Sequence, residues 1–104
     1  MSNRIIFGSK HSGETVSEVF DFTSRLALGE TISSATVTAA VYSGSDSSPS
    51  ALISGSASIS AGKVTQKVTG GTLGVTYTLT CTAITSASQT LELVGFLAIV
   101  PAAN

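Results

Sequence analysis

The chain has 104 residues, the size of one ordinary domain, and only 11% of them are charged. Ser and Thr supply 32 residues, and Val, Ile and Thr supply 30, a composition that favours β-strands over helices. The five basic and six acidic residues are dispersed, and no apolar run reaches the length of a membrane helix, so we expect neither nucleic-acid nor membrane partners. The first residues lack the pattern of a signal peptide, which predicts synthesis in the cytoplasm.

Strand-like alternation begins at residue 15. Residues 1–14 contain a short apolar run and then a polar stretch that interrupts any period, so we interpret them as an N-terminal arm or an edge strand. In the segment that follows, Phe20 and Phe22 share one side, and we expect both in the core. Residues 24–30 break the alternation and are expected to carry the chain from one sheet to the other.

Five further segments are predicted to be strands, namely residues 31–42, 54–61, 64–69, 75–83 and 90–100. Val37 lies on the core-like face of the first. In residues 75–83 apolar side chains alternate with threonines, which places Leu79 and Cys81 inward. Gly95 is interpreted as a bulge in the last strand.

Polar loops separate these strands, with an exposed loop at residues 43–50 and a hairpin at residues 86–89. The pattern predicts an all-β protein in which residues 15–101 form one antiparallel sandwich of six to seven strands. Residues 102–104 would be a short tail. A small barrel is the alternative architecture.

The chain offers little for catalysis. Its single histidine, His11, and its single cysteine, Cys81, are far apart in sequence, so we do not expect them to form a nucleophile–base pair. Cys81 lies on the inward-facing side of its predicted strand, which predicts a buried thiol. No second His or Cys stands at ligand spacing, so we expect no metal and no cofactor. Gly70, Gly71 and Gly74 precede a strand rather than a helix, which favours a structural corner over a phosphate loop. We therefore expect no catalytic residues and no enzyme.

The low charge also favours a protein that is covered by neighbours, because free monomers usually carry about 25–35% charged residues on their surface. Several copies in a symmetric assembly are expected. Residues 1–14 are the candidate interface arm, with the contacts expected from Arg4, Ile5, Ile6, Phe7, Lys10 and His11. Stripes of Ser and Thr in residues 54–60 and 76–82 are either solvated sheet faces or flat contact surfaces.

The run from Gly71 to Leu79 resembles the corner and penultimate strand of fibronectin-type and immunoglobulin-like domains. In those domains a tyrosine early in the strand hydrogen-bonds back across the corner. The resemblance implies an immunoglobulin-like sandwich in which Tyr77 takes that role, with Gly70, Gly71 and Gly74 forming the corner.

A narrower resemblance is carried by Val19-Phe20-Asp21-Phe22, Gly29-Glu30-Thr31-Ile32 and the corner before Tyr77. This set is similar to small virion proteins of tailed bacteriophages of the fiber-tail adaptor type. Two departures stand out: Phe22 replaces the usual tryptophan, and Ser88-Gln89 replaces a Gly-Arg hairpin.

The resemblance implies a structural virion protein made in the host bacterial cytoplasm and acting as a tail or fiber adaptor. Its partners would be other virion proteins such as the tail tube, the fiber, the portal or connector, or the major capsid protein. A capsid cement protein that stabilises the shell is the alternative. A module whose loops at residues 43–50 and 86–89 bind carbohydrate or another host-surface polymer is a further alternative.

Overall fold

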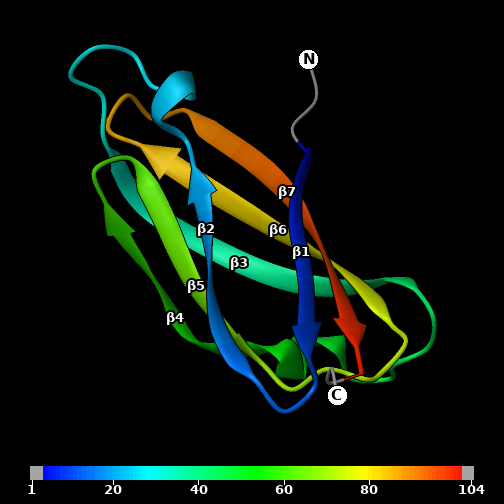
Figure 1. Cartoon of the computed structure of the whole chain (residues 1–104). Coiled ribbons are helices and arrows are strands. Elements are labelled where there is room, and N and C mark those ends of the chain that lie inside the picture. The colour runs from blue at the N-terminus through cyan, green and yellow to red at the C-terminus, as the bar shows by residue number, and fades with distance from the viewer. Residues whose placement is uncertain (1–3, 102–104) are drawn as a thin grey trace.

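The computed structural model describes residues 4–101, which form two β-sheets packed face to face (Figure 1). The elements are β1 (Arg4–His11), β2 (Thr15–Asp21), the short 3-10 helix η1 (Thr23–Arg25), β3 (Ile32–Ser43), the 3-10 helix η2 (Pro49–Leu52), β4 (Ile53–Ser60), β5 (Lys63–Thr69), β6 (Thr76–Thr85) and β7 (Thr90–Val100). One sheet has the order β1-β7-β6-β3 and the other β2-β5-β4. The predicted all-β sandwich is therefore confirmed.

Most neighbouring strands are antiparallel, but β1 pairs parallel to β7, so the four-stranded sheet is mixed. The strands within residues 15–101 pair antiparallel throughout, as predicted, and the one parallel pairing is added by β1. A three-stranded sheet packed on a four-stranded one, with the penultimate strand between the last strand and β3, is the arrangement of immunoglobulin-like domains.

The core lies between the sheets and follows from side-chain alternation. Along β6, buried and half-buried residues alternate, because every second side chain faces the opposite sheet. The five residues predicted for the core are all buried, namely Phe20, Phe22, Val37, Leu79 and Cys81.

Residues 4–11 of the predicted arm lie within the sheet as the edge strand β1. The ring of Phe7 packs edge-on against Phe20, with ring centroids 5.1 Å apart. Because β1 docks on β7 and places an aromatic ring beside the core, residues 4–11 form the edge strand, the second of the two interpretations, and not a free arm. The chain ends, residues 1–3 and 102–104, and the side chains of Arg4, Ile5 and Ile6 lie outside the described structure.

Gly95 has a packing role instead of the predicted bulge. It pairs in regular register with Leu79, and the β6–β7 ladder shows no irregularity there. A Cβ atom added to Gly95 would lie 2.1 Å from Cε2 of Phe7. The missing side chain at Gly95 therefore leaves the space that the Phe7 ring occupies.

Ser88 and Gln89, which replace the Gly-Arg pair of the similar proteins, lie in the hairpin between β6 and β7. Ser88 has φ +60°, a left-handed conformation that glycine adopts more readily than serine. The Thr85 hydroxyl accepts hydrogen bonds from the amides of Ala87 and Gln89, both at 3.2 Å. These bonds support the hairpin around a residue in a less favourable backbone conformation.

Candidate assembly interface

The two side chains with most intrinsic reactivity occupy different environments. Cys81 is buried in the central strand β6, and burial raises the pKa of its thiol to about 12. His11 lies at the turn between β1 and β2, where its Nδ1 is 3.7 Å from Oε2 of Glu14. Within residues 4–101, no three His, Cys, Asp or Glu side chains are grouped to hold a metal ion. That same part of the chain has no helix suited to crossing a membrane.

The sandwich is elongated, with extents of 46 × 25 × 25 Å, and its connections gather at its two ends (Figure 1). One end is formed by residues 22–31, 61–62 and 86–89, and we call it the Leu28 end. The opposite end is formed by residues 12–14, 44–52 and 70–75, and we call it the Leu73 end. An elongated module with loops at both ends has two separate places for contact.

At the Leu28 end, a tight turn displays Leu28 to solvent. The amide of Glu30 donates to the carbonyl of Ala27 at 2.9 Å, and Gly29 has φ +82°, as the third position of a type II turn requires. Leu28 is as exposed as in an open chain, at 106%. The Glu30 carboxylate accepts a 2.8 Å hydrogen bond from the amide of Ala27, so a side chain braces the turn.

This brace is connected to the rest of the sandwich. Hydrogen bonds from the Thr85 hydroxyl and the Ala27 amide hold the pKa of the Glu30 carboxyl below its usual value. Thr31 and Ser86 exchange two bonds, from the Thr31 amide to the Ser86 hydroxyl at 3.0 Å and from the Ser86 amide to the Thr31 carbonyl at 2.7 Å. Leu28 is therefore held on a turn that hydrogen bonds connect to the β6–β7 hairpin, although Oε2 of Glu30 is buried without a hydrogen-bond partner.

At the Leu73 end, a second turn repeats the same design. The amide of Val75 donates to the carbonyl of Thr72 at 3.1 Å, Gly74 has φ +84°, and Leu73 is 56% exposed. The amide of Gly74 donates to the carbonyl of Ile99 at 3.0 Å, which ties the turn to β7. Each end of the sandwich thus presents a Leu-Gly turn with the leucine outward.

Tyr77 braces this second turn. Its buried hydroxyl accepts a 2.8 Å hydrogen bond from the amide of Thr72 and donates at 2.5 Å to Oδ2 of Asp46. The donation from Tyr77, followed by that from the Ser48 amide, holds the pKa of Asp46 below its usual value. The loop at residues 43–50 is consequently attached to the corner through a carboxylate, although it has no apolar anchor.

The three glycines predicted for the corner, Gly70, Gly71 and Gly74, lie between β5 and β6 with positive φ. A Cβ atom on Gly71 would lie 2.8 Å from the side chain of Ile99. The corner therefore packs closely against β7 and sets Tyr77 beside Thr72.

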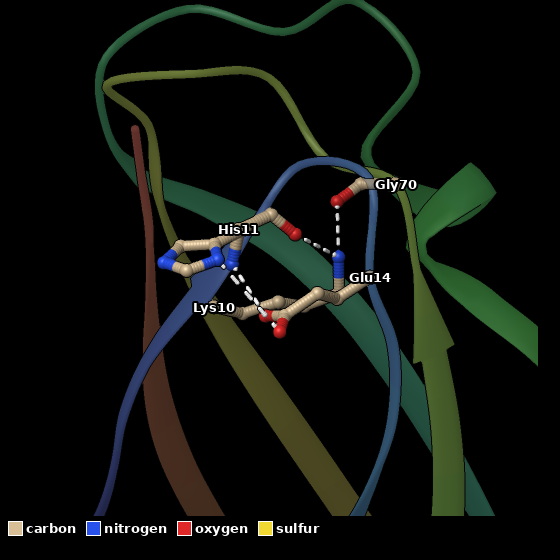
Figure 2. Close-up of polar contacts among 4 residues, drawn as sticks. All are labelled: Lys10, His11, Glu14 and Gly70. Atoms are coloured by element: carbon tan, nitrogen blue, oxygen red, sulfur yellow. Dashed lines mark hydrogen bonds and ion pairs between the residues drawn. The ribbon is translucent and has the colours of Figure 1, made fainter. Parts of the chain in front are cut away.

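Lys10 is buried at the Leu73 end, with only 2% of its surface exposed. Figure 2 shows its ammonium group between two carbonyl oxygens, that of His11 at 2.8 Å and that of Gly70 at 2.7 Å. Burial lowers the pKa of Lys10, and the nearby Glu14 carboxylate opposes this shift. Lys10 thus connects the β1–β2 turn to the corner that precedes β6.

We expect Lys10→Met to change how stability depends on pH. Because the pKa of Lys10 is lower in the folded state than in the unfolded state, the unfolded chain holds the extra proton between the two values. The free energy of unfolding of the wild type should therefore rise relative to that of Lys10→Met as the pH increases through this window toward 10.5. Urea unfolding of both proteins from about pH 7 upward measures this, and a difference that stays constant with pH contradicts it.

The outer face of the four-stranded sheet is neutral over most of its area. Thr76, Thr78, Thr80 and Thr82 of β6 are half-buried and lie beside strands β3 and β7. Tyr42 and Phe96 stack at one end of this face, with ring centroids 4.8 Å apart. The aromatic pair therefore joins the two strands on either side of the threonine stripe, Tyr42 from β3 and Phe96 from β7.

The described side chains of the candidate arm do not form one exposed surface. Phe7 packs on Phe20, Lys10 is buried, and His11 lies at the turn. Sequence reasoning missed the two displayed leucines. The signal that could have found them is the Leu-Gly dipeptide, which occurs at a turn on each end.

Fold and surfaces together define a small immunoglobulin-like β-sandwich with a tyrosine corner and a braced leucine turn at each end. A family model described as podophage GP4 fiber-tail adaptor protein gp77 matches residues 10–97. Because the match covers most of the chain, the chain belongs to this family, and the narrower resemblance seen in the sequence is confirmed. No curated protein matches the chain.

Proposed function

We propose that this chain is a structural adaptor in a podophage virion, where it joins a tail fiber to the tail by passive contact and catalyses no reaction. The observation that carries the proposal is the family match over residues 10–97. The buried Cys81 thiol, whose pKa is raised to about 12, supports a role without nucleophilic chemistry.

The two leucine turns suit such a role. A joining protein needs two contact sites that do not overlap, and Leu28 and Leu73 lie at opposite ends of a sandwich 46 Å long. An exposed apolar side chain on a pre-ordered turn loses little conformational entropy when a partner pocket covers it. We infer that one leucine contacts the fiber and the other contacts the tail.

Deleting the gene from the phage tests the function. Particles made without the protein should have filled heads and tails but no fibers in electron micrographs, and the gene supplied in trans should restore the fibers. Fibers on the deleted particles would refute the adaptor role. Heads that lose stability while fibers stay attached would favour the capsid cement alternative.

Leu28→Ser and Leu73→Ser should each block one attachment while leaving the fold intact. Both side chains are exposed, so the free energy of unfolding should change by no more than about 0.5 kcal/mol. We expect one variant to leave the protein on the fiber and the other to leave it on the tail, as measured by mass spectrometry of separated particles and free fibers. Val19→Ser is the matched control, because Val19 is an exposed apolar residue on the side of β2. Full fiber attachment with both leucine variants would refute their contact role.

A further inference from the structure

The strands β3 and β4 form one of the two edge sides of the sandwich, and β1 and β2 form the other. Within residues 4–101, β3 is one edge of the four-stranded sheet and β4 is one edge of the three-stranded sheet, so each pairs with a strand on one side only. An edge strand presents unpaired amide and carbonyl groups that accept another strand, and proteins usually protect it with charges, prolines or bulges. Whether β3 and β4 carry such protecting features therefore indicates whether they can accept another strand.

Charge is distributed unequally between the two sides of the sandwich. β3 and β4 contain no charged residue and no proline, whereas β1 and β2, on the opposite side, carry Arg4, Lys10, Glu18 and Asp21. The charge-free side belongs to a chain of net charge −1 with both signs present elsewhere. A neutral edge has no electrostatic repulsion from a copy of itself.

Of the two neutral edges, β3 has the longer uninterrupted stretch, because its pairing shifts only near its two ends, between Ile32 and Ser34 and between Val41 and Ser43. The pairing of β4 with β5 shifts between Ser54 and Ser58, and Gly55 has φ +72°. Nε2 of the buried Gln66 donates to the carbonyls of Ser54 and Gly55, both at 3.1 Å, and so occupies backbone groups at this irregularity. The pairing of β3 with β6 is continuous from Ser34 to Val41. β3 is therefore the edge that can accept a further strand.

A cavity of about 230 Å³ lies where the two edges meet. Its lining is mixed, with Ala35 and Val37 of β3 and Ala57 of β4 beside the polar residues Thr36, Ser56 and Gln66. If a single strand were added to β3, the inward-facing side chains of the added strand would extend past the edge of the three-stranded sheet. They would then have no opposing sheet to pack against. A second sandwich would bring its own second layer and close the cavity on both copies.

We propose that two copies of this chain pair through β3. The two β3 strands run antiparallel about a two-fold axis near the middle of residues 34–41, which joins the four-stranded sheets of both copies into one continuous sheet. The contact is isologous, so each neutral edge meets its own copy. This inference concerns the chain itself and goes beyond the proposed fiber and tail contacts, which lie at the two ends of the sandwich.

Sedimentation equilibrium of the purified full chain tests the pairing. We expect a monomer–dimer equilibrium for the wild type and at least a tenfold weaker dimer for Ala35→Lys, because the pairing would close over a lysine at the cavity and bury its charge without a partner. Ser17→Lys is the matched control, since Ser17 is exposed on the opposite edge strand β2, and its dimer should be as strong as that of the wild type.

Thr38→Lys is a second variant at an exposed position of β3, and it serves if Ala35→Lys does not fold. A Thr38→Cys variant should form a cross-linked homodimer with a short bis-maleimide, while the buried Cys81 stays unmodified. A wild-type chain that stays monomeric at all soluble concentrations overturns the proposal, as does a dimer that neither lysine weakens. Cross-linking of the Thr38→Cys variant in particles to a different virion protein would likewise overturn it, in favour of strand addition by that protein.

Discussion

Replacing Tyr77 with Phe should lower the free energy of unfolding by about 1–3 kcal/mol, the usual effect of leaving a buried hydrogen-bonding group without its partner. The Tyr77 hydroxyl is buried and bonds the Thr72 amide and the Asp46 carboxylate at once. The ring of phenylalanine fills the same space, so the loss comes from the polar contacts alone. Urea unfolding at neutral pH measures it.

Tyr42→Phe provides the control, because it removes the same atom from a tyrosine that is 60% exposed, and its effect should stay within about 0.5 kcal/mol. Acid should reduce the effect of Tyr77→Phe. The folded-state pKa of Asp46 lies below its usual 3.8, so the stability from this carboxylate is present above 3.8 and is lost as the pH falls through the folded value. Equal losses in the two tyrosine variants, or an effect of Tyr77→Phe unchanged by acid, would contradict this account of the corner.

The same brace connects stability with the proposed function. Tyr77 holds the amide of Thr72, and Thr72 is the first residue of the turn that displays Leu73. Glu30 has the equivalent place at the other end, where its carboxylate holds the amide of Ala27 before Leu28. In both turns a side chain satisfies the amide of the turn's first residue, so the leucine is presented in one orientation. A joining protein benefits from this order, since its contacts then lose less freedom on binding.

Much of the fold follows from side-chain alternation. The nine-residue alternation around Leu79 predicts the central strand and its buried face, and the glycines before Tyr77 predict the corner. The exposure of Leu28 and Leu73 does not follow from the sequence, because an apolar residue in a loop either packs inward or faces solvent. Composition does not distinguish these two cases. Only the closed hydrogen-bonded turns decide it at Leu28 and Leu73.

The contacts that sequence reasoning missed are long-range and specific. Lys10 is buried against its usual preference because two carbonyl oxygens meet its ammonium group, and one of them comes from Gly70, distant in sequence. Asp46 lies in a polar loop whose composition predicts only exposure, yet it meets Tyr77. The docking of β1 depends on Phe7 fitting over Gly95, and a three-residue apolar run does not reveal which side faces the core.

Gly95→Ala should destabilise the protein by about 1–3 kcal/mol, the usual range for overpacking a well-packed interior. The new Cβ atom would lie 2.1 Å from the Phe7 ring, so the ring must move away from Phe20 or β1 must shift on β7. Nothing else about the exchange is unfavourable, because alanine in a strand is normally better than glycine by about 0.5–1 kcal/mol. Thermal or urea unfolding measures the loss.

A double-mutant cycle with Phe7→Ala separates this clash from other effects of the new methyl group. Phe7→Ala alone should destabilise the protein, since it removes the aromatic contact with Phe20. Once the ring is gone, Gly95→Ala should be neutral or stabilising, which gives a coupling energy of about 1–3 kcal/mol between the two sites. Additive losses would mean that Phe7 does not lie over Gly95, and the docking of β1 would then need another explanation. A large coupling would establish that the edge strand is held by one aromatic ring fitting the surface that one glycine leaves open.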